Sequence, residues 1–366
     1  MAEKRFDVVG SFLRPESLKK ARASFEKGDI SAADFDAIKK EEIKKLIEKQ
    51  KKAGLPYITD GEYNRKFWHL DFFWGFNGVE HKKEGGGVPF NGEIADLEDT
   101  FITGKISAKA HPFVEDFKFV KSLESDGFEA KQTIPAPAQF LQQLNIPKNF
   151  EATRKIYPTN DELIEDIANA YRSVIKQFYD AGCRTLQLDD CTWGAVVGNA
   201  AAQRYEKLGS LKEVKEQLLK VNNLALAEKP SDMTINTHIC RGNYHSTYFT
   251  SGPYDTVADY VFAKENVSSL YLEYDDARSG GFAPLAKVSK EKKVVLGLIT
   301  TKSPVLEDKN AVIARIREAE KYIPLERLYL SPQCGFASCE IGNKLTEEEQ
   351  WAKIALVRKI AEEVWK

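Results

Sequence analysis

Four residues with metal-binding side chains stand at the ends of predicted strands. His238 and Cys240 are two residues apart, so in an extended segment their side chains share one face. A carboxylate, Glu273, and a second thiol, Cys334, follow two further predicted strands. Two thiolates with an imidazole and a carboxylate match tetrahedral Zn²⁺, and thiolates disfavour Mg²⁺ and Ca²⁺. The four residues predict a zinc site, with ordinary core packing of each residue as the alternative.

The composition of this ligand set indicates the chemistry. A catalytic zinc ion needs one exchangeable position, and Glu273 is the ligand expected to leave when a substrate sulfur arrives. A free thiol has a pKa of about 8.5 and is mostly protonated at neutral pH. Coordination to Zn²⁺ deprotonates it. Two cysteine ligands keep the bound sulfur electron-rich, which favours attack on an alkyl carbon over polarisation of a carbonyl.

The elements that must position these residues form an alternating pattern. Short β-branched or aromatic runs alternate with longer amphipathic segments, which is typical of parallel β/α units. No linker or internal repeat divides the chain, so we predict one domain over residues 1–366, a (β/α)₈ TIM barrel with its functional groups at the carboxyl ends of the strands. The predicted strands are Phe6–Phe12, Tyr57–Glu62, Glu129–Ile134, Thr185–Asp190, Thr234–Cys240, Ser269–Tyr274, Val294–Thr300 and Leu328–Pro332.

One stretch, at about 64–127, departs from the alternation. It opens with an aromatic run, Trp68–Phe76, and continues into a strand-like pattern around Asn91-Gly92, which is a hairpin signal. We interpret it as a hairpin-containing insertion after the second strand that covers one side of the barrel mouth. A peripheral hairpin at a dimer contact is the alternative.

Trp193 is a candidate for stacking on a flat donor ring, with core packing as the other interpretation.

Composition limits the other classes of function. The formal net charge of the 366 residues is −2, so no general basic field exists to hold nucleic acid or anionic lipid. No apolar run approaches the roughly 20 residues of a membrane span, and the N-terminus lacks the apolar core of a secretory signal. Five cysteines fit no disulfide framework. We expect a cytoplasmic protein, either a monomer or a homodimer.

Several short motifs also resemble a known family. In chain order they are Val9-Gly10-Ser11-Phe12-Leu13-Arg14, Asp60-Gly61-Glu62, Leu186-Gln187-Leu188-Asp189-Asp190, His238-Ile239-Cys240, Leu272-Glu273 and Ser331-Pro332-Gln333-Cys334-Gly335. Together they resemble the C-terminal catalytic barrel of the cobalamin-independent methionine synthases. The matches run from residue 9 to residue 335, so the resemblance covers nearly the whole chain.

The resemblance implies a role for each matching residue. The family's zinc ligands correspond to His238, Cys240, Glu273 and Cys334. The residues that hold the amino-acid thiol correspond to Gly10-Ser11 on its carboxylate side and to Glu62 and Asp189 at its amino group. The implied reaction is methyl transfer to homocysteine, giving methionine, from methyltetrahydrofolate or another methyl donor.

The sequence departs from the family in two respects. Full-length members carry a further N-terminal barrel that helps to bind polyglutamyl folate, and this sequence does not contain it. Where the family has Asp-x-His-Ser-Pro after the seventh strand, residues 300–304 are Thr-Thr-Lys-Ser-Pro. The family histidine is thought to help deliver a proton to the folate, so Lys302 is the catalytic candidate there, with an anion-binding or a solvated lysine as alternatives.

Three other functions stay open at this stage. A related barrel occurs in the uroporphyrinogen decarboxylases, which would have no use for the predicted metal ligands. Zinc alkyltransferases of similar type act on another thiol, such as coenzyme M. A zinc-binding module without activity would have a saturated metal site.

Overall fold

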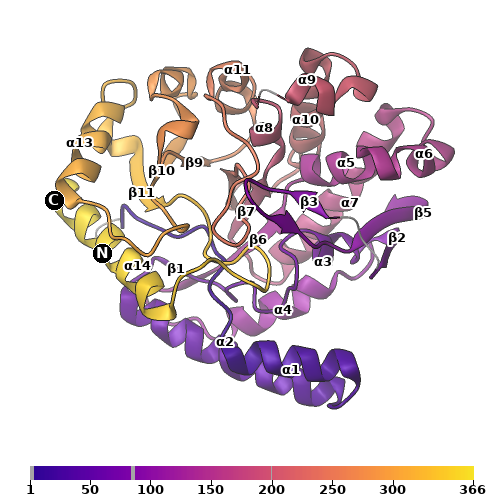
Figure 1. Cartoon of the computed structure of the whole chain (residues 1–366), viewed down its shortest axis with the longest axis horizontal. Coiled ribbons are helices and arrows are strands. Elements are labelled where there is room, and N and C mark those ends of the chain that lie inside the picture. The colour runs from indigo at the N-terminus through magenta and orange to yellow at the C-terminus, as the bar shows by residue number, and fades with distance from the viewer. Residues whose placement is uncertain (1–3, 84–86, 199) are drawn as a thin grey trace.

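The computed structural model describes residues 4–83, 87–198 and 200–366. Its centre is a curled, parallel sheet of seven strands in the order β1-β6-β7-β8-β9-β10-β11, and helices surround this sheet (Figure 1). The strands are β1 (Tyr57–Ile58), β6 (Glu129–Pro135), β7 (Thr185–Asp190), β8 (Thr234–Ile239), β9 (Ser269–Glu273), β10 (Lys293–Ile299) and β11 (Leu328–Pro332).

The helices fill the predicted connections. Strands β6, β7, β9 and β11 are almost entirely buried, as expected of a parallel sheet that is covered on its outer face. The α-helices are α1 (Glu16–Lys27), α2 (Ala32–Ala53), α3 (Leu70–Phe73), α4 (Pro112–Lys121), α5 (Pro137–Asn145), α6 (Pro147–Ile156), α7 (Asn160–Asp180), α8 (Thr192–Ala195), α9 (Ala201–Arg204), α10 (Leu211–Ala225), α11 (Asp255–Ala258), α12 (Val261–Lys264), α13 (Lys309–Ala319) and α14 (Glu347–Val364). Short 3₁₀ turns are η1 (Glu206–Leu208), η2 (Ala277–Ser279), η3 (Ala283–Lys287) and η4 (Leu325–Arg327).

Local sequence explains where the long helices begin. Ser31, Ser210 and Thr346 each accept a hydrogen bond from the backbone three residues later, and the acidic residue at that position bonds back to the cap. These capping boxes satisfy backbone donors that have no partner inside the helix. The capping box predicted at Thr346 is therefore present.

The first predicted strand takes a different form. Of Phe6–Phe12, only Phe6 pairs as a strand residue, in an isolated parallel bridge to Leu330 of β11. Beyond that bridge, side chains of neighbouring strands satisfy its carbonyls: Lys131 bonds to Val8 and Gln187 bonds to Val9. Because side chains, rather than backbone groups, are the hydrogen-bond partners of these carbonyls, the strand ladder is interrupted here. The closed eight-stranded barrel stays a prediction, and the observed sheet is barrel-like.

Residues between β1 and β6 form two small antiparallel sheets. Strand β2 (Asn77–Lys82) pairs with β5 (Asp99–Ser107), and β3 (Val88–Pro89) pairs with β4 (Ile94–Ala95). Gly92 has φ +90° in the turn between β3 and β4, so the hairpin predicted at Asn91-Gly92 is present. That the whole stretch is an insertion stays a prediction.

None of the helices in the described part of the chain combines the length and the apolar character that a membrane span requires.

A buried ion pair anchors the first segment to the sheet. The Lys131 ammonium lies 2.7 Å from the Asp7 carboxylate, and both side chains are almost inaccessible. Tyr271 also donates to the same Asp7 oxygen. Because Ser11 follows in the same segment, this ion pair helps to fix the position of a predicted site residue.

We predict that Lys131→Met lowers the free energy of unfolding by about 3–5 kcal/mol, because it leaves a buried carboxylate without its partner. Chemical denaturation measures this change. Lys176 pairs with Asp180 on the exposed surface of α7, so Lys176→Met is the matched control and should change stability by less than about 1 kcal/mol. Equal effects of the two substitutions would contradict the anchoring role.

Candidate active site

The four predicted metal ligands lie together at the carboxyl ends of three strands. His238 is in β8 and Cys240 follows it, Glu273 ends β9, and Cys334 lies two residues beyond β11. All four are buried, and one ligand atom from each lies within 4.8 Å of the others. The two Sγ atoms are 3.7 Å apart. Two sulfurs bound tetrahedrally at about 2.3 Å from Zn²⁺ would be about 3.8 Å apart.

Hydrogen bonds orient these ligands and leave the coordinating atoms free. The His238 Nδ1–H donates to the Tyr271 carbonyl, so Nε2 keeps its lone pair. One Glu273 oxygen accepts from the Arg241 backbone N–H. His238 Nε2 and Glu273 Oε2 are buried and have no hydrogen-bond partner within residues 4–83, 87–198 and 200–366. Burying such atoms unpaired is costly, so the donor set fits a cation that would satisfy them.

The thiols give a second argument for a cation. A hydrogen bond from Cys240 and burial raise the pKa of Cys334 well above its usual range. A hydrogen bond with Cys191 raises the pKa of Cys240. These protein groups therefore favour the neutral thiols, and a divalent cation is what would make both of them thiolates.

Three further predicted residues line the same cavity as the candidate ligands His238, Cys240 and Cys334: Ser11, Glu62 and Asp189. Glu62 has φ +62°, a left-handed backbone that is strained for this residue. Its Oε1 lies 3.4 Å from the buried Arg65 guanidinium, whereas Oε2 has no partner. Asp189 accepts from Gln187 through Oδ1. Two carboxylates therefore face the cavity, and one oxygen of Glu62 is unpaired.

The pKa values of both carboxyl groups are raised. Burial raises the pKa of Glu62 to about 7, with Asp189 adding to the effect and Arg65 opposing it. Burial likewise raises the pKa of Asp189 to about 7, against the hydrogen bond from Gln187. A ligand that carries a positive charge between them would favour their ionised forms. This end of the cavity is suited to an ammonium group.

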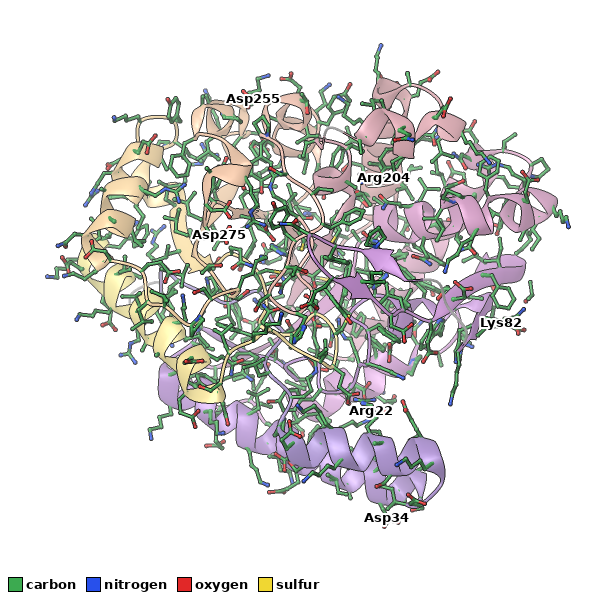
Figure 2. All side chains as sticks on the ribbon, in the orientation of Figure 1. Arg22, Asp34, Lys82, Arg204, Asp255 and Asp275 are labelled. Atoms are coloured by element: carbon green, nitrogen blue, oxygen red, sulfur yellow. The ribbon has the colours of Figure 1, made fainter. Side chains whose placement is uncertain are left out.

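The cavity has a volume of about 420 Å³ and a largely apolar remainder. The hairpin between β3 and β4 contributes Val88, Pro89, Phe90 and Ala95 to its wall. Arg204 at the end of α9, labelled in Figure 2, also lines the cavity and lies over the Phe249 ring at 4.6 Å. Other contributors are Trp68, His69, Gln139, Gln142, Gln143 and Cys191.

Three other candidates are not among the residues that line the cavity. Gly10 packs so closely on Thr133 that a Cβ would meet that side chain at 2.7 Å, so it shapes the backbone beside Ser11. Trp193 is fully buried and donates to Glu265. The Lys302 ammonium is buried without a hydrogen-bond partner in the described ranges. The hydroxyl of its neighbour Thr301 donates to the Gly335 carbonyl.

Sequence reasoning missed several residues of this site. Arg65, three residues after Glu62, is fully buried and bonds to Thr133 and Trp68. Gln139 and Arg204 reach the cavity from α5 and α9. Neither stands at a strand end, so the rule that located the metal ligands could not find them. The aromatic run Trp68–Phe76 serves two purposes. Trp68 and His69 line the cavity, while Phe72, Phe73 and Phe76 belong to the hydrophobic core.

Comparison with known sequences identifies one family. The family model described as the cobalamin-independent synthase catalytic domain matches residues 7–363. Uncharacterized protein YxjG of Bacillus subtilis (strain 168) is 42% identical, over 99% of this chain and 95% of its own length. The 5-methyltetrahydropteroyltriglutamate–homocysteine methyltransferase of Neisseria meningitidis serogroup C (strain 053442) is 24% identical over 98% of this chain, which spans 43% of that relative.

Solved structures agree with this assignment. A protein of Listeria monocytogenes described as a candidate vitamin-B12-independent methionine synthase has a TM-score of 0.79 at 36% identity, over 99% of this chain and 98% of that one. A B12-independent methionine synthase of Shewanella sp. W3-18-1, solved in complex with selenomethionine, has a TM-score of 0.72 at 19% identity, over 99% and 98% of the two chains. This second likeness supports the fold alone.

Proposed function

The chain belongs to the cobalamin-independent synthase catalytic-domain family, and from this we propose that it is a zinc-dependent methyltransferase that methylates the thiol of homocysteine. One observation carries the proposal. A single cavity is lined both by residues of the buried metal-binding quartet and by Ser11, Glu62 and Asp189. A thiol amino acid needs a site for its sulfur and a site for its α-amino and carboxylate groups, and this cavity offers both.

The chain's own residues would hold the amino acid at three points. Glu62 and Asp189 pair with the α-ammonium, and the unpaired Glu62 Oε2 gains a partner. Ser11 takes the α-carboxylate. Gly335 permits this arrangement, because a Cβ there would lie 1.8 Å from the Ser11 hydroxyl. The side chain of homocysteine then extends toward the four metal ligands.

Zn²⁺ held by His238, Cys240, Glu273 and Cys334 would supply the electrostatic stabilisation that keeps the substrate sulfur a thiolate at neutral pH. The protein orients that sulfur toward the methyl carbon of the second substrate. The new S–C bond forms from the sulfur lone pair as the bond to the leaving group breaks, and the leaving group then takes a proton. Holding both reactants in one cavity would supply much of the rate.

The donor proposed from the family is methyltetrahydrofolate, and the compartment is the reducing cytoplasm. All five cysteines are free, and the thiol ligands must stay reduced to bind a metal. Purified protein should form methionine from homocysteine when methyltetrahydrofolate is supplied with one or several glutamates. Methylcobalamin and S-methylmethionine form the comparison panel. No methionine from any of these donors would show the proposed reaction to be wrong.

The raised pKa values of Glu62 and Asp189 generate a pH prediction. Below about pH 7 both carboxyls are largely protonated and cannot pair with an ammonium, whereas above it they are ionised. Methionine has no thiol to titrate, so its binding isolates this effect. We expect methionine to bind at least about tenfold more tightly at pH 8 than at pH 5.5 by calorimetry. Asp189→Asn should flatten the profile, and a flat profile in the unaltered protein would contradict the assignment.

The metal-binding quartet generates a second prediction. Cys334→Ser should lose most of the bound zinc, measured by elemental analysis, and should lower methyl transfer by at least about 100-fold. Cys183→Ser is the matched control, because Cys183 is buried near β7 and its thiol donates to the Thr185 carbonyl. It should keep both the zinc and the activity. A Cys334→Ser protein that retains full zinc content would remove Cys334 from the ligand set.

A further inference from the structure

The amino-acid substrate leaves polar atoms of the cavity unused. Homocysteine has three polar groups, and the proposed function, on which this inference rests, gives each one a partner. His69 and Gln139 line the same cavity and take no part in that arrangement. Among the residues that the structure describes, His69 Nδ1 and Gln139 Oε1 are both buried without a hydrogen-bond partner. These two atoms are therefore free to meet the second substrate.

The surroundings of His69 hold its ring in place. The imidazole lies on Trp68, with 4.5 Å between ring centroids, and the edge of Phe73 contacts it at 5.8 Å. The side chain is 6% exposed. Burial lowers the pKa of His69 to about 3, so the ring is neutral across the physiological range and offers one donor and one acceptor nitrogen.

A second buried histidine in the same stretch shows how a structural histidine differs. The His111 Nε2–H donates to the Phe72 carbonyl at 3.0 Å, and its Nδ1 accepts from the Phe113 N–H at 3.3 Å. Both nitrogens of His111 are thus used by the protein, and His111 is not among the residues that line the cavity. His69 lines the cavity and leaves Nδ1 unpaired, which is the arrangement expected of a ligand-binding group.

Gln139 lines the same cavity as this histidine, and packing of their neighbours links the two segments. Phe73, which contacts the His69 ring, stacks on Phe140 at 4.4 Å, and Phe140 is the neighbour of Gln139 in α5. The Gln139 carbonyl oxygen can accept a hydrogen bond from an N–H or O–H donor. Much of the remaining wall of this cavity is apolar, with Val88, Phe90 and Leu97 among the lining residues.

We propose that His69, assisted by Gln139, is the residue that selects the methyl donor, by hydrogen bonding to an uncharged heteroatom on a flat part of that molecule. The chemical class of the group that is recognised follows from the side chains that His69 and Gln139 offer to the cavity. A neutral imidazole and an amide recognise uncharged ring nitrogens, amines or carbonyls, and they offer no charge to a phosphate or carboxylate. Trp68 supplies an aromatic surface to the same part of the cavity. An anionic portion of the donor would lie elsewhere, within reach of Arg204.

The test compares His69→Phe, His69→Asn and His69→Gln, using homocysteine and methyltetrahydrofolate monoglutamate. We expect His69→Phe to raise the KM for methyltetrahydrofolate roughly tenfold and to leave the KM for homocysteine within about twofold. Asn or Gln, which restores a polar atom near one ring nitrogen, should recover part of the loss. His81 is an exposed histidine stacked on Trp74, so His81→Phe is the control and should leave both KM values unchanged.

Thermal unfolding without substrate separates binding from structure. His69→Phe should keep or raise the Tm, because it removes a buried atom that has no partner. His111→Phe should lower the Tm, because it breaks two hydrogen bonds to the backbone. A fall in Tm with unchanged donor KM for His69→Phe would overturn the inference, and so would a rise in the KM for homocysteine alone. If the unaltered protein transfers no methyl group, the proposed function is wrong and the inference falls with it.

Discussion

Unpaired polar atoms at the carboxyl end of the sheet are the constraint on which the site depends. His238 Nε2, Glu273 Oε2 and Glu62 Oε2 are all buried without partners, and each carries a cost in an otherwise apolar interior. A metal ion would satisfy the first two atoms and an ammonium group the third, because a cation attracts both an imidazole lone pair and a carboxylate. The proposed ligands would thus bring the charges that this end of the sheet calls for.

The surrounding structure keeps those atoms unpaired by holding their neighbours tightly. Glu62 adopts a strained backbone, and Arg14 donates to its carbonyl. At Gly61 a Cβ would meet the side chain of Leu46 at 2.2 Å. The turn between Asp60 and Glu62 therefore has no room for a side chain at position 61. Buried arginines stabilise the charged form of a carboxylate that burial disfavours. Strain and buried charge of this kind are found where function requires them.

The hairpin of β3 and β4 forms part of the wall of the cavity. The Phe90 ring packs against Tyr244 and Phe249, and Glu93 joins His245 and Lys344 at the outer edge. These pairs connect the hairpin to loops that follow β8 and β11, the strands that carry three of the metal ligands. Apolar residues in the wall lower the local dielectric and strengthen each electrostatic interaction at the site. The same hairpin bounds the space proposed for the methyl donor.

The sequence was enough to locate most of the parallel strands and the residue types that follow them, although β1 is shorter than predicted and ends at Ile58 rather than Glu62. His238, Cys240, Glu273 and Cys334 were predictable because parallel strands bring their carboxyl ends to one edge, and period-two alternation decides which side chains share a face. The first strand was only partly predictable, because whether Val8 and Val9 bond to a strand or to the side chains of Lys131 and Gln187 depends on residues more than a hundred positions away.

Long-range packing selects which of the candidates reach the cavity. Trp193 and Lys302 follow strand ends just as the candidate metal ligands do, yet neither is among the residues that line it. His69 became a candidate for donor binding through an unpaired nitrogen, and His111, of the same residue type, did not. Sequence specifies which groups a side chain offers. The long-range packing around each group determines whether those groups are already paired or are left for a ligand.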